Sequence, residues 1–187
     1  MEPYQQLEDQ FGRWIGQPHV VTCSNGSTAL QLALEALQLP RGSQVLVPEF
    51  TMVACARAVT LAGLTPVFVD CGPDLCLDPR ALEARLTDTT RAIMPVHIYG
   101  RLCDMETIGA LARQHGLYVV EDCAEVHGAP LSGVADAYCF SFYANKIVAG
   151  EEGGAIAFKY AEHADLARSL RCQGFTAEHD YLHVPRG

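Results

Sequence analysis

A single lysine closes an apolar stretch of this sequence, and its position suggests covalent chemistry. Residues 138–143 read YCFSFY, and Lys146 follows them shortly before the paired glycines Gly153 and Gly154. A lysine at the mouth of a buried strand loses hydration, and desolvation favours the neutral amine that attacks an aldehyde. The alternative is a solvated loop lysine, because most lysines lie at protein surfaces.

A carboxylate ends a second apolar stretch. Asp122 follows the predicted strand 117–121 and precedes residues 123–129, CAEVHGA. A carboxylate in this position could hold a pyridinium nitrogen protonated, so that the ring withdraws electrons from a carbon attached to an imine. A helix cap or a surface ion pair is the alternative role for Asp122.

The third candidate is the segment 24–28, which joins a strand to a helix through small residues. Gly26, Ser27 and Thr28 would present backbone N–H groups at the positive end of a helix, where phosphate binds readily. Ordinary N-capping by Ser or Asn is equally compatible with this segment. The pattern GxxxxGK[ST] is absent here, so nucleoside triphosphate hydrolysis has no support. A phosphate-type loop, a strand-end carboxylate and a strand-end lysine together predict a pyridoxal phosphate site.

Alternating strands and helices would bring these three features together. Short apolar runs such as 45–47 and 118–120 are typical of a mostly parallel sheet with helices on both faces, an α/β three-layer α/β/α sandwich. Ligands of such sheets bind beyond the carboxyl ends of the strands. We predict helices at 4–15, 29–39, 52–62 (buried), 79–86, 104–115 and 162–172, and strands at 19–23, 44–48, 65–70, 91–97, 117–121, 138–143 and 155–158.

Composition limits the class of protein. The chain has 187 residues, of which 49% are hydrophobic, and a formal net charge of -9, so we expect one domain and no nucleic-acid partner. Its eight cysteines form no CxxC pair, which argues against a metal site or a redox dithiol and favours a reducing compartment. No signal peptide and no apolar run of about 18 residues is visible, so we expect a cytoplasmic protein without a membrane partner.

Five motifs in order resemble a known family, the DegT/DnrJ/EryC1/StrS sugar aminotransferases, which have the aspartate aminotransferase fold (fold type I). The resemblance covers nearly the whole chain. The motifs are CSNGSTALQLAL at 23–34, VPEFT at 47–51, MPVHIYG at 94–100, VEDCAEVHGA at 120–129, and FSFYANK at 140–146 with Gly153 and Gly154. The wording around Lys146 and the glutamate at 125 are most similar to the perosamine synthase branch, which aminates a GDP-linked 4-keto-6-deoxy sugar.

This resemblance implies a role for each candidate residue. Lys146 would form the internal aldimine and move protons, and Asp122 would bind the pyridine nitrogen. Glu125 would lie near the ring hydroxyl of the cofactor, and Ser141 would add a hydroxyl to the phosphate site at Gly26, Ser27 and Thr28. The family passes an amino group, usually from glutamate, to a nucleotide-linked keto sugar, in polysaccharide or lipopolysaccharide biosynthesis. The resemblance further implies a homodimer.

Three departures from the family pattern stand out. Met52 occupies a position that is usually aromatic and stacks on the pyridine ring; a thioether can cover that face as well. Glu151 and Glu152 make the loop after Lys146 more acidic, which could alter the proton affinity of the imine. Finally, family members continue into a smaller C-terminal domain. We therefore expect a cofactor-binding large domain at 1–175, followed by a tail at 176–187 that leads to a small domain outside this chain.

Several other functions stay open at this point. A sugar dehydratase of the same family is one, although such enzymes replace the imine lysine that this chain keeps at Lys146. A non-catalytic protein with the cofactor fold, or a partner subunit, is another. A cysteine enzyme using Cys123 and His127 is a weaker hypothesis, because no third orienting group is evident.

Overall fold

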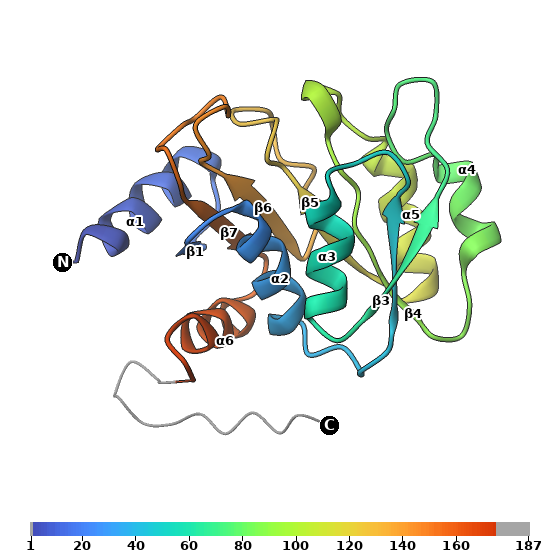
Figure 1. Ribbon diagram of the computed structural model, residues 1–187, viewed down its shortest axis with the longest axis horizontal. Coiled ribbons are helices and arrows are strands. Elements are labelled where there is room, and N and C mark those ends of the chain that lie inside the picture. The colour runs from blue at the N-terminus through green and yellow to red at the C-terminus, as the bar shows by residue number, and fades with distance from the viewer. Residues whose placement is uncertain (1, 175–187) are drawn as a thin grey trace.

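The computed structural model describes residues 2–174, which form a seven-stranded sheet with helices on both faces (Figure 1). The strands are β1 (His19–Cys23), β2 (Gln44–Pro48), β3 (Thr65–Val69), β4 (Thr90–Ile93), β5 (Tyr118–Asp122), β6 (Ala137–Ser141) and β7 (Gly154–Phe158). The helices are α1 (Pro3–Ile15), α2 (Gly26–Ala36), α3 (Val53–Leu61), α4 (Pro79–Leu82), α5 (Met105–His115) and α6 (Ala161–Arg171), with short 3-10 turns at Glu83–Arg85 and Ile98–Gly100.

The sheet is mostly parallel, which confirms the predicted fold class. Its strand order is β1-β7-β6-β5-β4-β2-β3. Strand β7 runs antiparallel to both of its neighbours, and every other pairing is parallel. The carboxyl ends of β2, β4, β5 and β6 therefore meet along one edge of the sheet, where ligands of open α/β sheets bind.

Alternation along β6 shows which helices share a face. Cys139 donates a hydrogen bond to the carbonyl of Ala29 on α2 (3.6 Å), so it points toward that helix. Its neighbour Phe140 points the opposite way, because successive strand residues alternate, and it meets Phe11 of α1 edge-on at 5.0 Å between ring centroids. Helix α2 in turn packs against α3 and α6, so α1 lies on the opposite face from these three.

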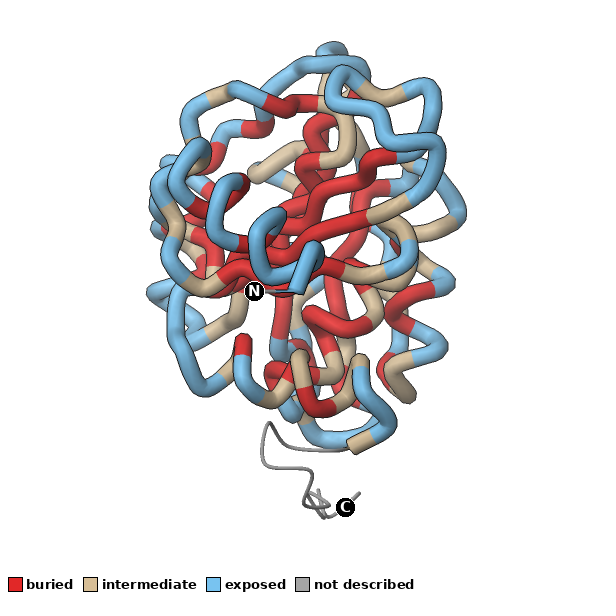
Figure 2. Tube along the Cα trace, turned by 90° about the vertical axis from the view of Figure 1, so that its left-hand side faces the viewer, coloured by how far each residue is buried: buried red, intermediate tan, exposed pale blue. Residues whose placement is uncertain are grey.

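The core fills the space between these layers. Strands β6 and β7 are buried at every position, and the buried trace runs through the centre of the molecule in Figure 2. Continuous apolar strands of this kind are expected in a sheet covered on both faces. No helix within residues 2–174 combines the length and the apolarity that crossing a bilayer requires.

The edge strand β1 is sealed by charged side chains. Glu8 of α1 accepts hydrogen bonds from the backbone N–H and the hydroxyl of Thr22. Arg171 of α6 donates to Glu8 (2.7 Å) and to the Thr22 carbonyl (2.8 Å), and Arg168 donates to the Val20 carbonyl (2.9 Å). An uncovered strand edge is a template for pairing with another chain. These bonds occupy that edge.

Some predicted boundaries shift. Strands β1 and β2 have the predicted bounds, whereas α2 begins three residues early, at Gly26, because Asn25 caps it. The predicted strand 91–97 ends at Ile93, and the predicted helix 79–86 divides into α4 and a 3-10 turn. Helix α3 is not buried as predicted: Cys55, Ala58 and Val59 face the core, but most of its other residues are exposed or half-buried.

Candidate active site

Asp122 lies buried at the carboxyl end of β5, which favours a functional carboxylate over a surface ion pair. The residue is 7% exposed. One oxygen, Oδ1, accepts a hydrogen bond from the N–H of Ala124 (3.0 Å), and the other, Oδ2, accepts one from the thiol of Cys55 (3.3 Å). Burial raises the pKa of Asp122, while these two hydrogen bonds and the positive charge of Lys146 oppose that rise.

The sheet register places Ser141 on the same face as Asp122. Asp122 pairs with Cys139 on the neighbouring strand, and Ser141 lies two residues further along β6, so all three side chains point to the α2 side. The N-terminus of α2 reaches the same place: a Cβ on Gly26 would sit only 2.7 Å from the Cβ of Ser141 and 3.0 Å from its Oγ. Glycine therefore allows the helix end to approach the serine hydroxyl.

Lys146 is held by a carboxylate in the loop beyond β6. Its side chain is 15% exposed, and its Nζ donates to Glu125 Oε1 at 3.1 Å. Glu125 Oε2 accepts a second hydrogen bond, from the backbone N–H of Tyr99 (2.6 Å). Tyr99 adopts a left-handed conformation, with φ of 53°, in the 3-10 turn that follows β4. Lys146 is thus an oriented, largely buried amine rather than a solvated loop lysine.

In the segment 24–28, some of the groups that could bind an anion are occupied by the N-cap of α2. Asn25 Oδ1 accepts hydrogen bonds from the N–H of Thr28 (2.8 Å) and from its hydroxyl (3.0 Å). The hydroxyl of Thr28 also lies 3.1 Å from that of Ser24. The N-capping interpretation is therefore confirmed. It leaves the first turn of α2 at Gly26 and Ser27, beside Ser141, as the segment that could receive a phosphate.

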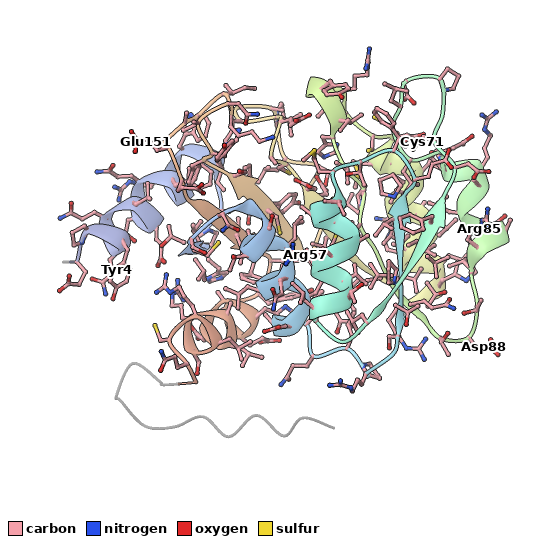
Figure 3. The ribbon with its side chains drawn as sticks, viewed as in Figure 1. Tyr4, Arg57, Cys71, Arg85, Asp88 and Glu151 are labelled. Atoms are coloured by element: carbon pink, nitrogen blue, oxygen red, sulfur yellow. The ribbon has the colours of Figure 1, made fainter. Side chains whose placement is uncertain are left out.

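Two of the departures from the family pattern, Met52 and the acidic pair after Lys146, are exposed to solvent. Met52 is the N-cap residue of α3 and is 62% exposed, so its thioether is free to cover a ligand. Glu151 and Glu152 are exposed, and Glu151 is labelled in the loop that follows Lys146 in Figure 3. Within the described residues no ion pair joins either of them to Lys146, whose partner is Glu125.

These residues fit pyridoxal phosphate. Asp122 is buried, and within residues 2–174 its two hydrogen-bond donors are both uncharged, so its carboxylate is suited to pair with a cationic ring nitrogen. Lys146 offers an amine, and the close approach of Gly26 to Ser141 brings a helix N-terminus and a hydroxyl together for a phosphate. The three features that the sequence predicted to converge do converge at one edge of the sheet.

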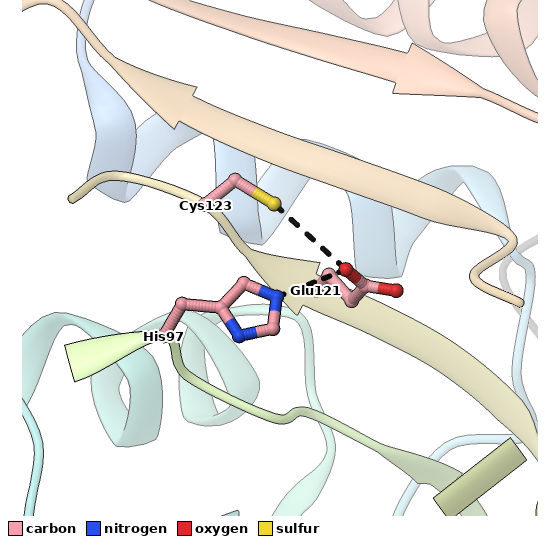
Figure 4. Close-up of side chains that lie close together, drawn as sticks. All are labelled: His97, Glu121 and Cys123. Atoms are coloured by element: carbon pink, nitrogen blue, oxygen red, sulfur yellow. Dashed lines mark hydrogen bonds and ion pairs between the residues drawn. The ribbon is translucent and has the colours of Figure 1, made fainter. Parts of the chain in front are cut away.

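A second polar cluster lies on the other face of the sheet and looks like a metal site. His97, Glu121 and Cys123 place their ligand atoms within 4.8 Å of one another (Figure 4). His97 Nε2 lies 3.0 Å from Glu121 Oε2, and His97 Nδ1 accepts the N–H of Cys103 (3.2 Å). Glu121 Oε1 accepts the hydroxyl of Ser132. The imidazole and carboxylate are therefore already satisfied, and the cluster is a buried hydrogen-bond network.

The cysteine-enzyme hypothesis finds no support. Burial raises the pKa of Cys123, and the negative charge of Glu121 adds to this, whereas a nucleophilic thiol needs a lowered pKa. The ring of His127 contacts those of Phe140 and Phe142, and neither of its nitrogens has a hydrogen-bond partner among residues 2–174. Burial lowers the pKa of His127, so its imidazole is neutral.

A groove of about 620 Å³ lies elsewhere, between α2 and α6. It is lined by Thr28, Gln31, Leu32 and Glu35 of α2 and by Leu170 and Arg171, among others. It includes neither Asp122 nor Lys146. The chemistry therefore points to the strand ends rather than to this groove.

Sequence reasoning missed two members of the site. Cys55 reads as a small core residue of an alanine-rich helix, yet it contacts the Asp122 carboxylate from 67 residues away. The backbone N–H of Tyr99 is invisible to any residue-type pattern. The one available signal for Cys55 is its spacing of four residues from Thr51, which precedes the N-cap of α3 and places its hydroxyl 3.2 Å from the Cys55 sulfur.

The sequence is similar to known proteins. The sequence profile of the DegT/DnrJ/EryC1/StrS aminotransferase family matches residues 2–186. A GDP-perosamine synthase of Caulobacter vibrioides is 43% identical over 182 residues, covering 94% of this chain and 49% of that protein. A UDP-N-acetyl-3-dehydro-alpha-D-glucosamine 3-aminotransferase of Acidithiobacillus ferrooxidans is 42% identical over 185 residues, covering 94% of this chain and 50% of that protein.

A solved structure resembles the whole fold. The Bacillus subtilis protein ntda, crystallised with the bound cofactor PMP, superimposes with a TM-score of 0.94 at 30% identity, covering 98% of this chain and 44% of that one. The chain spans about half the length of the curated relatives it matches.

Proposed function

The chain belongs to the DegT/DnrJ/EryC1/StrS aminotransferase family, and from this premise we propose that it forms the pyridoxal phosphate-binding part of a sugar aminotransferase. In the proposed reaction, glutamate gives its amino group to a nucleotide-linked keto sugar, so that 2-oxoglutarate and an amino sugar nucleotide are formed. The proposal is supported by the convergence of three features at one sheet edge: Lys146 lies near enough for its charge to act on Asp122, and the Gly26 turn meets Ser141 on the adjacent strand.

When bound, pyridoxal phosphate supplies an aldehyde that accepts amino groups and a ring that withdraws electrons. Asp122 would accept a hydrogen bond from the ring nitrogen and hold a positive charge there. Gly26 and Ser27, with the hydroxyl of Ser141, would bind the phosphate, and Thr28 would support that turn through its hydrogen bonds to Asn25. The thioether of Met52 would cover one face of the ring.

Lys146 would provide the covalent anchor and would carry protons at its Nζ atom. Glu125 positions that nitrogen, since its carboxylate holds both Nζ (3.1 Å) and the N–H of Tyr99 (2.6 Å). The Tyr99 contact fixes the carboxylate, so the amine can be directed at one point instead of sampling many rotamers. The ring hydroxyl of the cofactor would lie near Glu125 as well.

A homodimer is the proposed assembly. Several large apolar side chains that are close in sequence to the site residues are exposed to solvent; they include Phe50, Met52, Tyr99 and Ile147. Exposed apolar residues gathered around a site are typical of an interface with another chain. We further propose residues 1–175 as the cofactor-binding domain; the predicted tail at 176–187 lies outside the described residues. Sedimentation velocity would test the assembly.

Cofactor binding is tested by spectroscopy. The protein is titrated with pyridoxal phosphate, and we expect a visible absorption band that borohydride removes. Mass spectrometry should then place the cofactor mass on the peptide that contains Lys146, and Lys146→Ala should show neither signal. A colourless protein at saturating cofactor would refute the binding proposal.

Amino transfer needs a separate measurement. Adding glutamate to the coloured protein should convert the spectrum to that of the amine form of the cofactor and release 2-oxoglutarate. If the cofactor binds but no amino donor changes the spectrum, this chain is a non-catalytic cofactor-fold protein or a partner subunit. Glu152→Gln is the control for Lys146→Ala, because it removes an exposed charge from the same loop and leaves Lys146 and its partner Glu125 in place.

A further inference from the structure

Cys55, the third residue of α3, contacts the carboxylate of Asp122. Its Sγ lies 3.3 Å from Asp122 Oδ2, and the hydroxyl of Thr51 lies 3.2 Å from the same sulfur. Cys55 is fully buried. Since Ala124 N–H occupies Oδ1, both carboxylate oxygens have a partner, and one of these partners is a thiol.

The thiol is the donor in this contact. An ionised carboxylate only accepts hydrogen bonds, whereas a thiol has one proton to donate. Burial raises the pKa of Cys55, and the negative charge of Asp122 raises it further, so the sulfur keeps its proton. The hydroxyl of Thr51 can then donate to the sulfur, which leaves the S–H directed at Asp122.

We propose that Cys55 is a positioning residue that fixes the orientation of the Asp122 carboxylate and stabilises its charged form for a cationic ring nitrogen. The inference rests on the proposed function, because the role of Asp122 toward the cofactor is itself proposed. Cys55 acts through Asp122 and does not need to touch the cofactor.

Other groups around Asp122 do not replace this contact. The positive charge of Lys146 favours the ionised carboxylate from a distance, and His97 also lies near enough to interact electrostatically with Asp122. The thiols of Cys123 and Cys139 also lie near enough to interact electrostatically with Asp122. Within residues 2–174, however, Cys55 is the one side chain that forms a hydrogen bond with the Asp122 carboxylate.

The first test uses the protein without cofactor. The carboxyl ¹³C resonance of Asp122, assigned with Asp122→Asn, is followed against pH in the wild type and in Cys55→Ala. Losing a donor destabilises the carboxylate, so Asp122 should titrate at a higher pH in Cys55→Ala. Cys55→Ser keeps a donor and should titrate as the wild type does. Cys76→Ala is the matched control, because Cys76 is equally buried but donates to the Arg101 carbonyl.

The second test uses the cofactor. Cys55→Ala should bind pyridoxal phosphate about fivefold more weakly than the wild type, which corresponds to the typical contribution of one hydrogen bond. As the pH is lowered, Cys55→Ala should also lose the cofactor at a higher pH than the wild type does. Cys55→Val keeps the site filled without a donor and should behave as Cys55→Ala does.

Two results would overturn the inference. One is an unchanged titration of Asp122 in Cys55→Ala and Cys55→Val, and the other is unchanged cofactor affinity in both variants. If the wild type itself fails to bind pyridoxal phosphate, the proposed function fails, and the titration in the cofactor-free protein still decides whether Cys55 controls Asp122.

Discussion

Gly26→Ala should damage both stability and the phosphate-type turn, because there is no room for a side chain at this position. The added Cβ would lie 2.7 Å from Ser141 Cβ and 3.3 Å from Ser141 Cα. Carbon atoms prefer about 3.5–4.0 Å, so α2 or β6 must move by close to 1 Å. Neither yields easily, since Ser141 lies in a buried strand.

The expected loss of stability in Gly26→Ala follows from the cost of overpacking. Inserting a methyl group into a packed core costs about 1–3 kcal/mol. With a urea m-value of about 2 kcal/mol/M for a chain of this size, the unfolding midpoint should fall by about 0.5–1.5 M. The affinity for pyridoxal phosphate should fall as well, because the helix end and the Ser141 hydroxyl separate.

Gly150→Ala is the matched control. A Cβ on Gly150 meets its nearest atom, the Glu152 carbonyl oxygen, at an ordinary 3.5 Å, so its midpoint should stay within error of the wild type or rise slightly. Ser141→Gly removes the two nearest atoms, Cβ and Oγ, and in combination with Gly26→Ala it should cost less than the sum of the two single changes. Equal midpoints for Gly26→Ala and Gly150→Ala would refute the steric argument.

Three further changes probe other parts of the fold. Arg171→Met should cost about 3 kcal/mol in urea unfolding, because it leaves the buried Glu8 carboxylate without its 2.7 Å partner; Glu8→Gln in the same chain should recover part of the loss. Burial raises the pKa of Asp122, so the folded state binds this proton more tightly than the unfolded chain does, and ionisation costs stability as pH rises through the folded pKa. Asp122→Asn should therefore unfold at higher urea than the wild type at pH 7, with the advantage shrinking in acid. Among the cysteines, exposed Cys172 should react first with Ellman's reagent, and Cys172→Ser should abolish that fast phase.

Local patterns predicted most of the elements. The strands β1 and β2 are short apolar runs between turn residues, and such runs have few competing structures. The predicted strand 91–97 ends early, at Ile93, because Pro95 has no N–H to donate to a neighbouring strand. Met94 still donates to the Leu46 carbonyl (2.8 Å), and beyond the proline Val96 meets Asp122 only as an isolated bridge.

The site was predictable in its parts and not in its contacts. Lys146 and Asp122 were found because strand ends are where α/β sheets place functional groups. The partner of Lys146 was not: the acidic loop at Glu151 and Glu152 was the nearer candidate in sequence, yet Glu125 holds the amine. Such a pairing depends on how the loops after β5 and β6 fold back over the sheet. The residue types along the chain do not reveal which side chains of these loops come within hydrogen-bond distance of each other.

The position of β1 has a consequence for how the chain folds. Among residues 2–174, β1 (His19–Cys23) pairs only with β7 (Gly154–Phe158), so the first strand to be synthesised meets this partner more than one hundred residues later. Pairings between such distant segments close slowly. During synthesis β1 therefore stays unpaired while the residues up to β7 are made, and Arg171, the partner of Glu8, is synthesised later still. Pulsed hydrogen exchange should find the β1 amides among the last to become protected.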